Sequence, residues 1–126
     1  MTMLAPMLSV RAGKQALAFY REAFDAVATV HAEDDEGRIV AEVRIGDAAA
    51  FWVNDEAPVD ANYAPDTLGG STTRMVLIVE DPDAAVAQAI KAGARTVWPV
   101  GEKHGWRIGR VRDPFGHHWE IGRKLS

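Results

Sequence analysis

The chain has 126 residues, of which 48% are hydrophobic and 25% charged, a composition that suits one globular domain and excludes a largely disordered chain. Its 14 basic and 18 acidic side chains give a net charge of −4 without a large basic cluster, which excludes a typical nucleic-acid partner. The absence of cysteine excludes disulfides and thiolate metal sites, and no run approaches the roughly 20 apolar residues of a membrane span, so we expect a cytoplasmic protein without a membrane partner.

The first half of the chain predicts a strand, a helix and three more strands. An apolar run at 4–10 predicts the first strand, and Leu17, Tyr20 and Phe24 recur at helical spacing within a helix over 14–24. Further strands are expected at 27–32, 39–45 and 48–53, separated by an acidic turn and by a Gly-Asp pair. In the middle strand, Ala41 and Val43 alternate with Glu42 and Arg44, so its two faces should differ in polarity.

The same order of elements returns in the second half. The residues of the connecting segment show no period, and it reads as a loop. A strand is then expected at 75–79, and a helix capped by Asp81 runs from Pro82 to 92. Strands at 95–100, 106–112 and 118–123 complete the unit. The sequence therefore predicts one α+β domain of two tandem βαβββ modules, at 3–54 and 73–124, with a linker at 55–72 and a curved mixed sheet around a cleft.

The stretch 113–122 carries the most distinctive pattern. Asp-Pro followed by Gly116 predicts a tight turn from Asp113, because proline presets φ and glycine tolerates positive φ. In the strand that follows, His118 and Glu120 fall on one face, and His117, Trp119 and Ile121 fall on the other. A carboxylate within a strand is costly to bury unless it is paired, hydrogen-bonded or bound to a metal, so Glu120 is the leading site candidate.

These features resemble the glyoxalase/bleomycin-resistance/extradiol-dioxygenase family, also called the vicinal oxygen chelate superfamily, and in particular its PhnB-like small proteins. The resemblance rests on residues 8–10 with 18–24, on 79–83 with 92–94, and on 113–117 with Trp119 and Glu120. It implies paired βαβββ modules, and it implies dimers that share or complete the cleft. The family includes lyases, isomerases, dioxygenases and metal-free binding proteins, so the fold does not fix the function.

The ligand set separates these functions. In the metal-dependent members, the resemblance places the metal ligands at four positions that correspond here to Ala5, roughly Ala50, Arg74 and Glu120. Among these residues, Glu120 alone can bind a metal, and the fixed charge of an arginine repels a cation. We therefore expect no metal cofactor, and the alternative is a divalent ion held by Glu120 with non-standard partners.

Several residues have two interpretations. Glu120 either acts as a base or metal ligand or forms an ion pair with Arg74, which we favour. His118 either titrates in the cleft or lies in water at its rim. Trp52 either forms an aromatic wall of the cleft or packs in the core. Arg107 either contacts the ligand or pairs with an acidic neighbour such as Asp113.

Residues 101–107 have the composition of a mobile flap, with two glycines around charged and aromatic side chains. His104, Trp106 and Arg107 are its candidate ligand contacts. Together with the strand residues Trp52, Arg74, His118 and Glu120, they form the predicted binding site. The sequence thus predicts a homodimer that binds a small molecule, and the alternative is a metal-dependent lyase, isomerase or dioxygenase that uses Glu120 as its catalytic residue.

Overall fold

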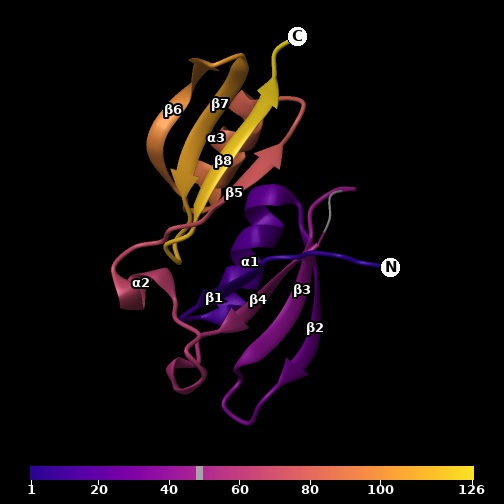
Figure 1. The fold of residues 1–126 in the computed structure, drawn as a ribbon, viewed down its shortest axis with the longest axis vertical. Coiled ribbons are helices and arrows are strands. Elements are labelled where there is room, and N and C mark those ends of the chain that lie inside the picture. Colours follow the sequence, from indigo (N-terminus) through magenta and orange to yellow (C-terminus); the bar gives the residue numbers. More distant parts are fainter. Residues whose placement is uncertain (48–49) are drawn as a thin grey trace.

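The computed structural model describes residues 1–47 and 50–126, which form two successive βαβββ modules (Figure 1). The first module contains β1 (Met7–Val10), α1 (Gly13–Phe24), β2 (Val27–Glu33), β3 (Ile39–Arg44) and β4 (Phe51–Asp55). Its sheet has the order β1-β4-β3-β2, in which β1 runs parallel to β4 and the other neighbours are antiparallel. Residues 48 and 49 of the predicted strand 48–53 lie outside the described residues, and residues 51–53 belong to β4.

The second module repeats this arrangement. It contains β5 (Arg74–Ile78), α3 (Pro82–Ala92), β6 (Arg95–Lys103), β7 (Trp106–Arg112) and β8 (His118–Lys124). Its sheet has the order β5-β8-β7-β6, with β5 parallel to β8. The predicted α+β fold of tandem βαβββ modules is therefore confirmed, and in the described residues each module has its own four-stranded sheet.

The connecting segment contains two short helical turns that the sequence did not predict. They are η1 (Pro58–Asp60) and α2 (Pro65–Leu68), and each begins at a proline and ends before a residue with positive φ, Ala61 or Gly69. Proline suits the first position of a helix because its φ is already helical. Helices of three or four residues are too short to show a hydrophobic period, so the segment reads as a loop in the sequence.

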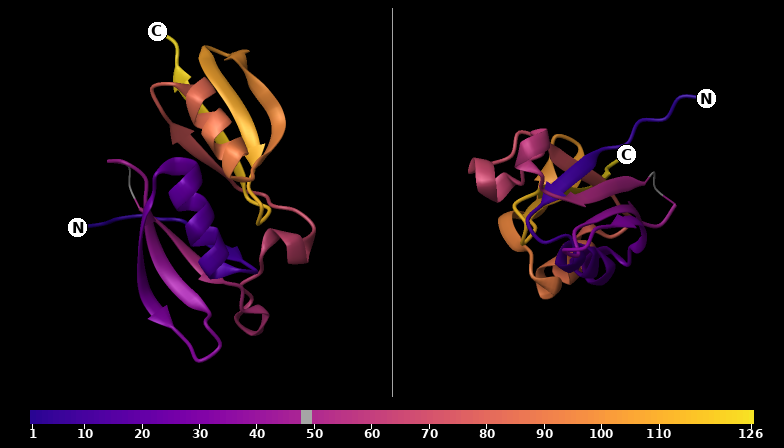
Figure 2. Two further views of the ribbon diagram at one scale, coloured as in Figure 1. Left: turned by 180° about the vertical axis from the view of Figure 1, so that it is seen from behind. Right: turned by 90° about the horizontal axis from the view of Figure 1, so that it is seen from below.

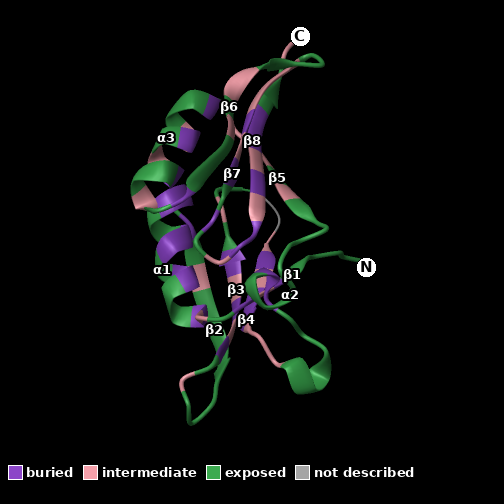
Figure 3. Cartoon of the chain, turned by 90° about the vertical axis from the view of Figure 1, so that its left-hand side faces the viewer, coloured by how far each residue is buried: buried purple, intermediate pink, exposed green. Residues whose placement is uncertain are grey.

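Both long helices lie on the same side of the two sheets and pack against each other (Figure 2). The buried residues gather where the helices face the strands (Figure 3). On β3, Ala41 and Val43 are buried while Glu42 is half-buried and Arg44 exposed, which confirms the predicted alternation. Neither α1 nor α3 covers the opposite side of a sheet, which we call the open face.

A buried carboxylate joins the two modules. Asp113 is 1% exposed and accepts a hydrogen bond of 2.6 Å from the Tyr20 hydroxyl of α1 and one of 3.0 Å from Trp119 Nε1 of β8. It also accepts from the backbone N–H groups of Phe115 and His117. The predicted turn is confirmed, because the N–H of Gly116 donates to the Asp113 carbonyl and Gly116 has a φ of +95°. The turn thus fixes β8 against α1.

None of the helices in the described part of the chain combines the length and the apolar character that a bilayer crossing requires.

Candidate functional site

An ion triad lies on the open face of the second sheet. Glu120 of β8 is opposite Arg110 on β7, and its Oε2 accepts a hydrogen bond of 2.9 Å from Arg110 Nη2. Arg74 of β5 donates from Nε to the same oxygen. The side chain of Glu120 is 14% exposed, that of Arg110 24% and that of Arg74 54%. The predicted Arg74–Glu120 pair is confirmed, although the two residues lie on neighbouring strands of one sheet rather than across a cleft.

Arg110 is the member that the sequence reasoning missed. It follows Ile108 by two residues on β7 and precedes Arg112 by two, so the alternation of that strand could have placed it on the same face as Glu120. Its guanidinium carbon also lies 5.7 Å from the ring centroid of Trp98. Arg110 thus connects the acidic centre of the site with an aromatic wall.

The triad keeps Glu120 ionised. Burial by itself raises the pKa of the carboxyl group, because a charged group loses hydration, but the hydrogen bonds and charges of Arg110 and Arg74 outweigh that effect. The pKa of Glu120 therefore lies below the ordinary value of 4.5. A carboxylate with a lowered pKa is a weak general base near neutral pH, since it holds a proton poorly.

Next to the triad is a cavity of about 330 Å³, which we call the apolar cavity. Its apolar lining consists of Val76, Trp98, Trp106 and Ile108. Two indole rings and two aliphatic side chains suit a flat or apolar ligand, because such a ligand loses little hydration when it enters.

Three polar side chains, Lys103, His104 and Glu120, also line the apolar cavity. The ammonium group of Lys103 lies 4.1 Å from the centroid of the Trp98 ring, a cation–π contact. His104 and Gly105 have positive φ values of 51° and 82° and form the two-residue turn between β6 and β7. The expected flap over 101–107 is therefore wrong, because residues 101–103 and 106–107 belong to the two strands of this hairpin.

Arg74, His118 and Arg110 line a second cavity of about 80 Å³ together with Ser71, Thr72 and Thr73. We call it the polar cavity. His118 Nδ1 is buried and has no hydrogen-bond partner among the described residues. Burial lowers the pKa of His118, and the nearby charges of Arg110 and Arg112 lower it further against the opposing charge of Asp113. The imidazole is thus mainly neutral at pH 7.

The other two predicted residues lie away from these cavities. Trp52 is on the first sheet, opposite Glu42, and its ring centroid is 4.8 Å from that of His31. Arg107 pairs with Asp83 of α3 through hydrogen bonds of 2.7 and 2.8 Å, rather than with Asp113. The structure therefore brings His104, Trp106 and Glu120 together in the apolar cavity, places Arg74 and His118 beside them, and separates Trp52 and Arg107 from the group.

A divalent metal does not fit this set of donors. In the described residues, no three His, Asp or Glu side chains come close enough together to hold a metal ion. The single carboxylate of the triad faces two guanidinium groups, whose positive charges oppose a divalent cation. The arrangement can instead bind an apolar group beside a paired carboxylate, with excess positive charge nearby.

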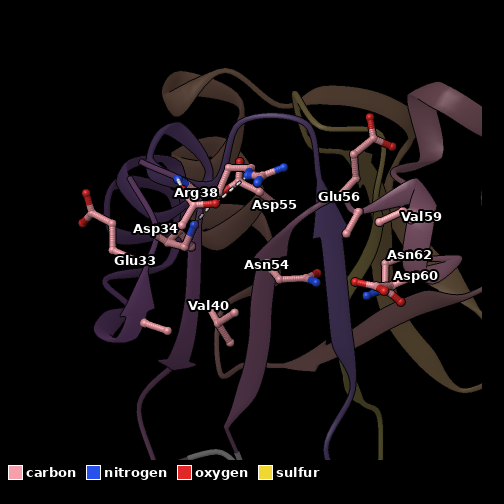
Figure 4. A pocket seen from close by; sticks show the side chains of 13 residues that line it. Glu33, Asp34, Arg38, Val40, Asn54, Asp55, Glu56, Val59, Asp60 and Asn62 are labelled. Atoms are coloured by element: carbon pink, nitrogen blue, oxygen red, sulfur yellow. Dashed lines mark hydrogen bonds and ion pairs between the residues drawn. The ribbon is translucent and has the colours of Figure 1, made fainter. Parts of the chain in front are cut away.

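Another cavity lies at the edge of the first sheet and has a volume of about 470 Å³ (Figure 4). Its acidic side chains already serve the fold. Asp55 accepts from the backbone N–H groups of Gly13 and Ile39, at 2.8 and 2.7 Å, and Asp34 pairs with Arg38. Because these carboxylates hold loop and strand ends in place, this cavity is a weaker candidate than the apolar cavity.

Comparison with known proteins places this geometry in context. A family model described as a glyoxalase-like domain matches residues 7–122. An uncharacterized protein of Mycobacterium bovis is 36% identical over an alignment of 127 positions, which covers 97% of this chain and 83% of that protein. The structure of a gene product from Arabidopsis thaliana is 31% identical with a TM-score of 0.73, and the match covers 96% of both chains. An enzyme of the glyoxalase/bleomycin resistance protein/dioxygenase family from Burkholderia phytofirmans has a TM-score of 0.73 at 18% identity, covering 94% of this chain and 95% of that one, a likeness of fold alone.

Proposed function

This chain belongs to the glyoxalase-like domain family within the vicinal oxygen chelate superfamily, and from that premise we propose that it binds a small organic molecule in the apolar cavity of its second sheet. One observation supports this role above the others. Glu120, which by resemblance stands at a metal-ligand position of the metal-dependent members, is paired with Arg74 and Arg110 beside a cavity that contains two tryptophans. Such a site offers a ligand stacking surfaces and hydrogen bonds, but it offers a metal poor ligands.

The donor chemistry favours binding without a metal. By resemblance, two of the four positions that hold the metal in metal-dependent members correspond to alanines, Ala5 and roughly Ala50, and a third corresponds to Arg74. A cation at Glu120 would have to displace two charge-assisted hydrogen bonds and remain close to both guanidinium groups. A metal-dependent lyase, isomerase or dioxygenase that uses Glu120 is the opposite outcome of the test below.

The proposed active form is a homodimer. Val76 and Ile78 of β5 are 58% and 66% exposed, and both lie on the open face, where Val76 also lines the apolar cavity. Exposed aliphatic side chains next to a binding cavity are typical of a surface that a partner covers. A second copy of the chain on this face would exclude water from the cavity and thereby strengthen apolar binding.

The experiment combines metal analysis with ligand screening. The purified protein is analysed for metal by plasma mass spectrometry and melted with added Ni²⁺, Zn²⁺, Mn²⁺ or Fe²⁺. It is then screened against small apolar and aromatic compounds by thermal shift and by quenching of tryptophan fluorescence. We expect no stoichiometric metal, no metal-dependent shift, and hits that the Trp106→Ala variant loses.

A matched pair of variants makes the metal test decisive. Glu120→Gln removes the carboxylate of the triad, whereas Glu22→Gln removes an equivalent charge from the exposed side of α1. A stoichiometric metal, or a large metal-dependent increase in melting temperature that Glu120→Gln abolishes and Glu22→Gln retains, would refute the metal-free proposal.

A further inference from the structure

The polar cavity combines positive charge with hydrogen-bond donors. Two of its six lining residues, Arg74 and Arg110, carry guanidinium groups, and Thr72 and Thr73 carry hydroxyl groups. Its lining contains no carboxylate in the described residues. The Ser71 hydroxyl already donates to the Thr73 carbonyl at 3.0 Å, so it serves the loop rather than a ligand. The chemistry of this lining favours an anion.

Two nitrogen atoms in this lining have unmet hydrogen-bonding capacity. Arg110 Nε and His118 Nδ1 are both buried, and neither has a partner among the described residues. Burying a hydrogen-bonding atom without a partner costs roughly 1–3 kcal/mol, so such atoms call for an explanation. Arg110 Nε is a donor, and the neutral imidazole of His118 is a donor at Nδ1 in the tautomer that carries its proton there. They belong to neighbouring strands and to residues that line the same cavity, which makes a common partner in that cavity the simplest explanation.

The charges of the ion triad do not cancel. Two guanidinium groups face a single carboxylate, so the triad keeps a net charge of +1. The next cation along β7 does not need a further partner, because Arg112 pairs with Asp66 at 2.9 Å. One additional negative charge beside Arg74 and Arg110 would therefore neutralise the triad. Because Arg110 is partly buried, water does not fully screen its attraction for an anion.

The volume sets the size of the anionic group. A cavity of about 80 Å³ is several times smaller than the roughly 300–1,000 Å³ of a site that encloses a whole small molecule. It can hold a carboxylate or a phosphate group but not a whole metabolite. The rest of the ligand must lie elsewhere, and the apolar cavity is adjacent, because Glu120 lines that cavity and bonds to both arginines of this one.

We infer that the polar cavity is an oxyanion subsite, and that the ligand of this protein has a flat apolar body in the apolar cavity and a small carboxylate or phosphate group held by Arg74, Arg110 and His118. This inference rests on the proposed function, since it specifies the class of ligand for the same site. In it, the triad's carboxylate orients the two guanidinium groups, and the ligand's oxyanion accepts their remaining hydrogen bonds.

The test uses four simple probes observed by NMR on the full chain: acetate, inorganic phosphate, benzoate and neutral benzyl alcohol. We expect acetate or phosphate to shift the amide signals of residues 71–74 and 118, and whichever of them binds tighter identifies the kind of oxyanion. Benzoate should shift the side-chain N–H signals of Trp98 and Trp106 as well, and should bind at least about tenfold more tightly than benzyl alcohol.

Three variants separate the effect of the subsite from that of general electrostatics. Arg110→Met removes one charge from the polar cavity and should weaken anion binding about tenfold. Arg107→Met removes the same charge from the helix-facing side of β7, where Arg107 pairs with Asp83 of α3, and should change anion binding less than about twofold. Thr73→Val, which leaves every charge in place, should also weaken anion binding.

The outcomes distinguish the inference from the function on which it rests. If benzyl alcohol binds but the anions do not, or if Arg107→Met weakens anion binding as much as Arg110→Met, the oxyanion subsite is refuted while the proposed apolar binding survives. If benzoate and benzyl alcohol bind equally, the two cavities do not share one ligand. If none of the four probes binds, both the inference and the proposed function are refuted.

Discussion

The ion triad makes a quantitative prediction for Glu120→Gln. This substitution keeps the shape of the side chain but removes the negative charge, so Arg110 loses a charge-assisted hydrogen bond in a site where its side chain is 24% exposed. Hydrogen bonds to charged groups contribute about 1.5–3 kcal/mol each, and the amide oxygen of Gln retains part of that. We expect the variant to lose about 2 kcal/mol of unfolding free energy at pH 7. For a chain of this length that corresponds to a fall of about 8 °C in the melting temperature.

A double-mutant cycle shows how the two arginines share this effect. Combining Glu120→Gln with Arg110→Met should give a coupling energy of about 1.5 kcal/mol, since Arg110 is mostly shielded from water. The same cycle with Arg74→Met should give about 0.5 kcal/mol, because that side chain is 54% exposed and its ion pair is weakened by solvent. Both cycles are measured by urea denaturation with circular dichroism, and methionine preserves the apolar stem of each arginine.

The pH dependence has a definite sign. The folded-state pKa of Glu120 is lowered, so the stabilisation from its ionised form is fully present above the ordinary pKa of 4.5 and is lost as the pH falls through the folded-state value. The difference in stability between the wild type and Glu120→Gln should therefore be largest at neutral pH and shrink below pH 4.5. A variant that equals the wild type at pH 7, or a difference that grows on acidification, would show that the triad does not stabilise the fold.

Three further predictions concern the rest of the molecule. Tyr20→Phe removes a buried hydrogen bond to Asp113 and should lower the unfolding free energy by about 2 kcal/mol, measured by urea denaturation. Burial and the charge of Asp113 hold the pKa of Tyr20 well above 10.0. The wild type should therefore lose stability as the pH rises past 10, and the variant should lose less. Gly116→Ala should lower the melting temperature far more than Gly46→Ala. Both glycines have positive φ, so the backbone strain is similar. A Cβ at 116 would lie 2.8 Å from a neighbouring side chain, however, whereas one at 46 meets nothing within 4 Å. If the protein is the proposed dimer, Ile78→Lys should convert it to a monomer in sedimentation velocity without unfolding it, because that side chain is 66% exposed in the single chain.

Local sequence patterns predicted the helices and strands well, because the caps and the alternation of buried residues depend on residues that are close in the sequence. The helix over Pro82–Ala92 begins and ends as predicted, and the side chain of Asp81 accepts a hydrogen bond from the Ala84 N–H, the expected cap. On β8, Trp119 and Ile121 are buried while His118 and Glu120 are half-buried, as the alternation indicated. In each case the physical cause lies within four residues of its effect.

The wrong predictions concern features that composition or the pattern of a single strand does not determine. Two glycines in residues 101–107 suggested a flap, but a two-residue turn needs positive φ at both positions, which His104 and Gly105 supply within a hairpin. Alternation left Trp52 either on a wall of the cleft or in the core, and it could not tell that the sheet of Trp52 is separate from that of Glu120; the structure leaves Trp52 half-buried on the first sheet. Which strands pair is decided by contacts between distant residues, and those leave no local period.

The two carboxylates of the stretch 113–122 have different surroundings, and the difference shows that the arginines beside Glu120 matter as much for ligand binding as Glu120 itself. Asp113 is enclosed by four donors from the described residues, so its oxygens serve the joint between the modules. Glu120 accepts from Arg74 and Arg110 through Oε2 alone, but a guanidinium group has five N–H donors and one carboxylate oxygen cannot use those of both arginines. The site thus keeps donor capacity together with positive charge. A search of the sequence for metal ligands considers side chains that can donate an electron pair to a cation, whereas this geometry favours a ligand that carries a negative charge.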